Sequence, residues 1–146
     1  MIRVIHLGVG GRGRHWLDFV VDHPDCTSVA CVDPDAPTLD AARGVGGLES
    51  SKFLASFDQA IQEVSADAVL IASPSFLHGQ HVHQALDAGF AVMVEKPFSV
   101  DLDEALTLAG FQVTVGNKPS KLVYGYILVA FAAVGVGVLL VRPEQL

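Results

Sequence analysis

Residues 2–13 read IRVIHLGVGGRG. The first six of these residues are mostly apolar and lead directly into glycines, a pattern that predicts a short buried strand. Trp16, Phe19 and Val20 then recur at the spacing of one face of a helix, and Pro24 stops that helix. A strand that passes through a glycine-rich turn into a helix is typical of the first unit of an open α/β sheet.

The alternation of strand and helix continues along the chain. Short apolar runs predict further strands at 28–32, 53–55, 67–72, 90–94 and 111–115, with helices between them at 38–43, 58–64, 76–88 and 101–109. Strands joined by helical crossovers form a mainly parallel sheet with helices on both faces. We therefore expect an α/β, doubly wound domain over residues 1–117.

The composition limits what this domain can bind and where it works. The chain has 146 residues, 51% of them hydrophobic, and a net charge of −7. An acidic chain without a basic run is a poor match for nucleic acid, whose binding depends on Lys and Arg. Cys26 and Cys31 lack CxxC spacing, and the first residues do not resemble a signal peptide. We expect a cytoplasmic domain with reduced thiols.

The glycines after the first strand have G-x-G-x-x-G spacing, in the strand-to-helix context that a dinucleotide-binding site needs. Gly8 permits a tight turn, Gly10 allows a pyrophosphate to approach the backbone, and Gly13 lets the helix pack close to the strand. The pyrophosphate would then lie at the helix N-terminus, beside Gly11 and Arg12. The motif predicts a Rossmann domain that binds a dinucleotide, and a glycine-rich turn without a ligand is the alternative.

Asp33 lies 20 residues beyond Gly13, at the end of the second predicted strand. A carboxylate in this place can accept hydrogen bonds from both ribose hydroxyls of the adenosine half. It would repel a 2′-phosphate, and Pro34 and Asp35 follow it where a cation would be needed. NAD is therefore favoured over NADP. A turn or N-cap aspartate before Pro34 is the alternative.

Two further motifs lie at the carboxyl ends of predicted strands, where open parallel sheets bind ligands. Glu95, Lys96 and Pro97 form the tripeptide EKP, whose lysine could take part in proton transfer; a solvated surface pair is the alternative. Residues 73–78 read SPSFLH, in which Pro74 sets a turn. Its histidine and the two that follow do not share one helix face, so we expect no metal site.

Taken together and in this order, GVGGRG, Asp33, SPSFLH and EKP resemble the N-terminal domain of the Gfo/Idh/MocA family, named for glucose–fructose oxidoreductase and inositol dehydrogenase. The resemblance covers about residues 2–117. It implies an oxidoreductase that transfers hydride between NAD(P) and a sugar, a cyclitol or a similar small molecule. The residues that it assigns to the cofactor site are Gly8, Gly10, Gly11, Arg12, Gly13, Asp33, Ser73, Pro74, His78, Glu95 and Lys96, with Lys96 also catalytic.

This family normally continues into a second domain that forms the substrate pocket, and we expect that domain to be absent here. We therefore expect a chain that is inactive alone, and a non-catalytic dinucleotide-binding module, held at a membrane, is the alternative. Residues 122–141 contain no charge and are long enough for a bilayer-spanning helix. We expect an apolar C-terminal helix there. A transmembrane span, an apolar element packed on the sheet, and the product of a truncated or frame-shifted gene remain open.

Overall fold

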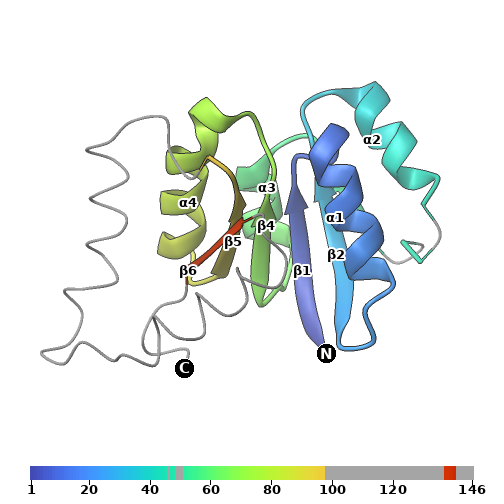
Figure 1. Ribbon diagram of the computed structural model, residues 1–146, viewed down its shortest axis with the longest axis horizontal. Helices are drawn as coiled ribbons and strands as arrows, with labels where there is room; N and C mark the ends of the chain where they lie inside the picture. The colour runs from blue at the N-terminus through green and yellow to red at the C-terminus, as the bar shows by residue number, and fades with distance from the viewer. Residues whose placement is uncertain (46, 49–50, 98–136, 141–146) are drawn as a thin grey trace, which may run out of the picture.

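The computed structural model describes residues 1–45, 47–48, 51–97 and 137–140 (Figure 1). Strands and helices alternate along the chain, as the sequence predicts. The elements are β1 (Ile2–Leu7), α1 (Gly11–Val21), β2 (Cys26–Val32), α2 (Ala36–Arg43), β3 (Lys52–Leu54), α3 (Phe57–Glu63), β4 (Ala68–Ile71), the 3-10 turn η1 (Ser75–Leu77), α4 (His78–Asp87), β5 (Ala91–Glu95) and β6 (Gly137–Leu140).

The strands form one sheet in the order β3-β2-β1-β4-β5-β6. Every pairing from β3 to β5 is parallel, so the expected doubly wound, mainly parallel fold is confirmed. The chain builds outward from β1 to β3 and then returns to place β4 on the other side of β1. The loops that follow β1 and β4 therefore leave the sheet in opposite directions, and a crevice opens between them at the carboxyl ends of the strands.

Helices cover both faces of the sheet, which explains why β1 reads as a nearly continuous apolar run. Ile5 and Leu7 pack on one face with buried residues of α3 and α4. Val4 points to the other face and packs with Val20 of α1. With helices on both faces, a ligand can reach the sheet at the ends of its strands, and open parallel sheets bind ligands at the carboxyl ends.

His6 is a polar residue inside this core. It is fully buried on the α1 side of β1, and its Nε2 lies within hydrogen-bond distance of Ser28 Oγ, 2.9 Å away. Its Nδ1 has no hydrogen-bond partner among the described residues. Burial lowers the pKa of His6 from 6.5 to about 4, because a charged ring would lose its hydration here. The native fold therefore holds the neutral imidazole.

We expect the domain to lose stability in mild acid for this reason. Between pH 6.5 and about 4, the unfolded chain binds a proton at His6 that the folded chain does not. The free energy of unfolding therefore falls as the pH falls through that window, by up to about 3 kcal/mol. The hydrogen bonds from Arg3 hold the pKa of Asp67 at about 2, so this carboxylate titrates below the window.

Denaturant unfolding at a series of pH values measures this dependence. The His6→Gln variant keeps an amide that can pair with Ser28 but has no group that titrates, so its stability should vary less with pH. The exposed His15 provides the matched control, and His15→Gln should retain the wild-type slope. A His6→Gln variant with the wild-type slope would show that another group controls the acid sensitivity.

The expected C-terminal apolar helix is wrong for residues 137–140. These residues form β6, which pairs antiparallel with β5, from Val92 opposite Leu140 to Glu95 opposite Gly137. The outer edge of β5 offers unpaired N–H and C=O groups. A segment containing Val and Gly can pair with these groups as a strand as readily as it can form a helix. The rest of the 122–141 segment, the helix at 101–109 and the strand at 111–115 lie outside the described residues. No described helix is long and apolar enough to cross a membrane.

Candidate functional site

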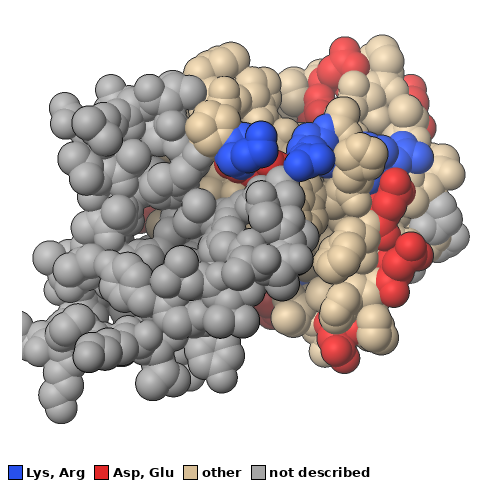
Figure 2. All heavy atoms as spheres, in the orientation of Figure 1, with Lys and Arg blue, Asp and Glu red and all other residues tan. Residues whose placement is uncertain are grey.

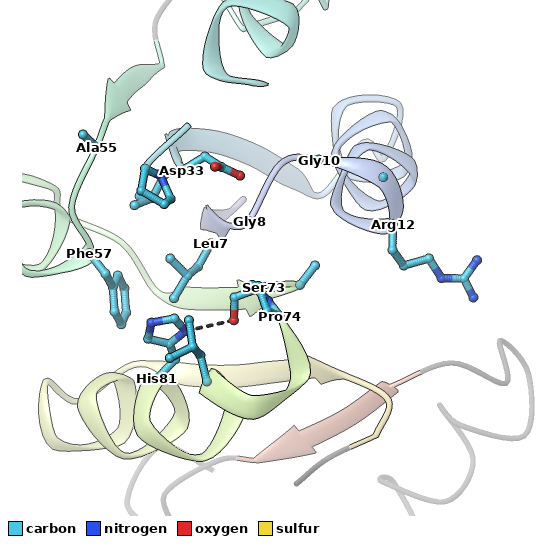
Figure 3. Close-up of a pocket in the computed structure, with 15 residues that line it drawn as sticks. Leu7, Gly8, Gly10, Arg12, Asp33, Ala55, Phe57, Ser73, Pro74 and His81 are labelled. Carbon is cyan, nitrogen blue, oxygen red and sulfur yellow. Dashed lines mark hydrogen bonds between the residues drawn. The ribbon is translucent and has the colours of Figure 1, made fainter. Parts of the chain in front are cut away.

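A cavity of about 520 Å³ lies in the crevice at the carboxyl ends of the strands (Figure 3). Residues that follow β1, β2, β3 and β4 line it together with the start of α1. Seven of the residues expected at a cofactor site are among them: Gly8, Gly10, Gly11, Arg12, Asp33, Ser73 and Pro74. The fold therefore brings together motifs that are far apart in the sequence.

Gly8 and Gly13 are required by the protein's own packing. Gly8 has a φ of +86°, and a Cβ there would lie 2.7 Å from backbone atoms of Ala72 and Ser73. Any residue with a side chain would be strained at that φ and would collide with the end of β4. A Cβ on Gly13 would overlap the backbone of Gly8, because α1 crosses directly over the turn. These two glycines allow β1, β4 and α1 to meet closely.

The packing of the protein does not require glycine at positions 10 and 11. A Cβ on Gly10 would meet only Thr38 Cγ2, at an ordinary contact distance of 3.6 Å, and a Cβ on Gly11 would have nothing within 4 Å. Both residues line the cavity at the start of α1, where Gly10 is the N-cap. The backbone is thus bare beside a helix N-terminus, whose unpaired N–H groups favour an anion. This open space fits the pyrophosphate of a dinucleotide.

Asp33 is held at the edge of the cavity by two backbone groups. Its Oδ2 accepts a hydrogen bond from Val9 N at 3.1 Å, and its Oδ1 accepts one from Asp35 N at 3.0 Å. A carboxylate oxygen has more than one acceptor site, so both oxygens can still accept from ribose hydroxyls. The N-cap of α2 is Asp35, which accepts hydrogen bonds from Thr38. Asp33 therefore bridges the glycine turn and the loop after β2.

Glu95 joins the end of β5 to the first turns of α1. Its carboxylate is buried, and Oε1 accepts hydrogen bonds from Arg12 Nε at 3.1 Å and Trp16 Nε1 at 2.6 Å. Its Oε2 accepts one from the backbone N of Lys96 at 3.1 Å. Glu95 does not itself line the cavity, and it holds Arg12 at the cavity wall.

Lys96 is exposed at the carboxyl end of β5 and lies outside the set of described residues that line the cavity. Arg12 is also half exposed, with 51% of its side chain accessible. Basic side chains form a short row across the described part of the face in Figure 2, although the chain as a whole is acidic. Positive charge on this face suits the approach of an anionic ligand.

His78 lies behind the cavity wall. It is buried, and its two ring nitrogens lie within hydrogen-bond distance of main-chain oxygens, Nδ1 at 2.7 Å from Pro97 O and Nε2 at 2.8 Å from Ser73 O. The ring thereby ties the loop after β4 to the loop after β5. The helix expected over 76–88 begins at His78, and the three residues before it form the 3-10 turn η1. His78 shapes the cavity through these loops.

Sequence reasoning missed two aromatic residues of the cavity, Phe57 and His81. His81 was considered only as a metal ligand, and no cluster of metal-binding side chains occurs among the described residues. Its Nδ1 lies 2.9 Å from Ser73 Oγ, and its ring meets Phe57 edge-on with centroids 6.0 Å apart. The available signal was the spacing of four residues between Leu77, at the end of η1, and His81 in the first turns of α4, which places both side chains toward the cavity.

Residues 2–117 match the model of an oxidoreductase family with an NAD-binding Rossmann fold. Inositol 2-dehydrogenase 1 of Paenarthrobacter aurescens (strain TC1) is 31% identical over 118 residues, which are 80% of this chain and 34% of that protein. Crystal structures of larger dehydrogenases match the fold. Scyllo-inositol dehydrogenase from Lactobacillus casei, with NAD(H) and scyllo-inositol, has a TM-score of 0.67 and 28% identity over 73% of this chain and 31% of its own.

A second solved structure, the WlbA dehydrogenase from Chromobacterium violaceum with NADH and UDP-GlcNAcA, has a TM-score of 0.67 and 27% identity over 75% of this chain and 31% of its own. The chain spans about a third of the length of the relatives it matches. The fold and the site define the NAD-binding Rossmann domain of an oxidoreductase. The chain belongs to the Gfo/Idh/MocA family, which confirms the resemblance seen in its motifs.

Proposed function

We propose that this domain binds NAD(H) in the cavity, in preference to NADP(H). The observation that carries the proposal is the bare backbone of Gly10 and Gly11 at the start of α1, which the packing of the protein does not require. An anion placed there would meet the N-terminal N–H groups of the helix and the half-exposed guanidinium of Arg12. The carboxylate of Asp33, oriented by Val9 N and Asp35 N, is the proposed partner of the adenosine ribose.

In this proposal, some of the remaining site residues contact the cofactor, and the others hold those contacting residues in place. Ser73 and Pro74 line the cavity, and His78 holds their loop in place through Ser73 O. Glu95 holds Arg12 on one side and the backbone of Lys96 on the other. We assign Lys96 to the reacting end of the cofactor, as the residue that exchanges a proton with the substrate.

The proposed reaction class is oxidation or reduction of a sugar, a cyclitol or a similar small alcohol. NAD supplies the hydride acceptor or donor when it is bound. The support is the family membership and the presence of inositol and nucleotide-sugar dehydrogenases among the matched structures. The competing function is a dinucleotide-binding module without turnover, favoured by the exposure of Lys96 outside the cavity.

A turnover assay on the purified chain distinguishes these two functions. The purified full chain is incubated with NAD and a panel of inositols and sugars, and NADH formation is followed with Lys96→Ala as the paired variant. Turnover that disappears in Lys96→Ala supports the enzyme. NADH binding in both proteins without turnover in either supports the module.

We expect NADH to bind at least about tenfold more tightly than NADPH, because the 2′-phosphate would lie beside the carboxylate of Asp33. The Asp33→Asn variant keeps an oxygen for one of the two backbone N–H groups and removes the charge, so the preference should shrink to a few-fold. Asp40→Asn changes the net charge equally on the exposed side of α2 and should leave the preference intact.

Titration with each nucleotide can be followed through Trp16, the one tryptophan of the chain, because its indole shares the Glu95 carboxylate with Arg12 at the cavity wall. Equal affinities of the wild-type chain for NADH and NADPH would refute the role given to Asp33. Failure of both nucleotides to bind would refute the proposed function.

A further inference from the structure

We propose that His81 is the residue whose ring the adenine base of the dinucleotide packs against. This inference rests on the proposed function and extends it to a residue outside the family motifs found in the sequence. Figure 3 shows Asp33, Phe57 and His81 on one side of the cavity and Arg12 on the other. If the ribose lies at Asp33 and the pyrophosphate lies toward Arg12, the adenine base lies on the side of the cavity that Phe57 and His81 form.

The cavity is apolar and aromatic on that side. Ala55 and Phe57 follow β3, and Leu77 and His81 come from η1 and α4. Phe57 is 6% exposed, and its ring stands at 78° to that of His81. Two rings at nearly a right angle form a corner, and a planar heteroaromatic base can lie flat on one ring with its edge toward the other. A phosphate, which is charged and not planar, would gain nothing from such a corner.

His81 is fixed in place before any ligand binds. The hydrogen bond between its Nδ1 and Ser73 Oγ sets the plane of the ring, and the edge-on contact with Phe57 packs its side. Only part of the residue is exposed, so the ring has little freedom to lose when a base covers it. A wall oriented in this way stabilises the bound base without a conformational change.

The charge state of His81 suits an apolar partner. Burial and the neighbouring His78 lower the pKa of His81, and Asp58 on α3 opposes them. The other charged groups at the cavity are Asp33 after β2 and Arg12 on α1. Since the lowering influences dominate, the ring is neutral at neutral pH, and covering it with a base does not bury a charge.

The test compares the two halves of the cofactor. The dissociation constants of NADH, ADP-ribose and reduced nicotinamide mononucleotide are measured by calorimetry for the full wild-type chain and its variants. We expect His81→Ala to bind NADH and ADP-ribose about tenfold more weakly and the mononucleotide unchanged, as loss of a stacking partner predicts. His81→Phe keeps a flat ring and should bind ADP-ribose within about threefold of wild type. His83→Ala, two positions along α4 and outside the cavity lining, is the matched control and should match wild type for all ligands.

The outcomes distinguish this role from a purely structural one. If His81→Ala weakens both halves of the cofactor equally, or if His81→Phe is as weak as His81→Ala, the ring does not act as a wall for the base and the inference is wrong. Wild-type affinity of His81→Ala for ADP-ribose would overturn it as well. If the wild-type chain binds neither NADH nor ADP-ribose, the proposed function fails and this inference fails with it.

Discussion

Replacement of Gly13 by alanine should destabilise the domain by about 3 kcal/mol, a large share of the roughly 5–15 kcal/mol that holds an ordinary domain together. The new Cβ would overlap the backbone of Gly8, and neither atom can rotate away as a flexible side chain could. Alanine gains up to about 1 kcal/mol over glycine in a helix interior, which is less than the expected cost of moving α1 away from β1.

Thermal and denaturant unfolding measure this loss, which corresponds to a drop of roughly 10–20 °C in Tm for a domain of this size. Gly11→Ala is the matched control, because the same change two residues earlier places a Cβ in open space. It should unfold at the wild-type temperature or slightly above. A Gly13→Ala variant as stable as Gly11→Ala would mean that α1 does not pack on the glycine turn in the way described.

Replacement of Gly10 by alanine should have the opposite effect, with the stability of the domain preserved and the affinity for the nucleotide much reduced. Its Cβ would meet Thr38 Cγ2 at 3.6 Å, an ordinary van der Waals contact, so the fold can accept it. The same methyl group stands at the cavity wall, where the pyrophosphate needs the bare backbone. We expect the affinity for NADH to fall about a hundredfold, or nearly 3 kcal/mol.

The measurement is an NADH titration of Gly10→Ala beside its melting curve. Asp40→Asn, on the exposed side of α2, is a control for changes that lie outside the cavity. Unchanged NADH affinity in a folded Gly10→Ala variant would argue that the pyrophosphate does not lie on this turn. Together with Gly13→Ala, the variant separates the glycines that the fold needs from those that the ligand needs.

These two predictions concern the same glycine turn, which would place the cofactor relative to the rest of the domain. In the proposed binding mode, the pyrophosphate would contact the glycine turn, whose backbone also joins β1, β4 and α1. Glu95 extends that junction to β5. Its buried carboxylate accepts hydrogen bonds from the side chain of Arg12 and from the backbone N of Lys96. A cofactor bound at Arg12 would therefore be placed relative to Lys96 by the fold itself.

The fold of residues 1–97 could be predicted from the sequence because its signals are local. Buried parallel strands read as short apolar runs, and Gly8 and Gly13 stand where the backbone needs them whatever surrounds them. Asp33 was found for the same reason, since the crossover from β1 to β2 has a nearly constant length. The charge-free stretch at 122–141 was misread over 137–140, because an apolar run has no period that distinguishes a helix from a buried strand.

The sequence by itself determined the doubly wound sheet and the residues of the glycine turn, and it predicted a dinucleotide site at the carboxyl edge of that sheet. Only the tertiary structure decided which groups Glu95, His78 and His81 contact. The contacts of Glu95 with Arg12 and Trp16 join residues 83 and 79 positions apart in the chain. The direction of a side chain at the end of an element depends on which other elements meet there, and no local pattern carries that information. His78 is therefore buried between two loops, while His81, three residues later on the same helix, lines the cavity.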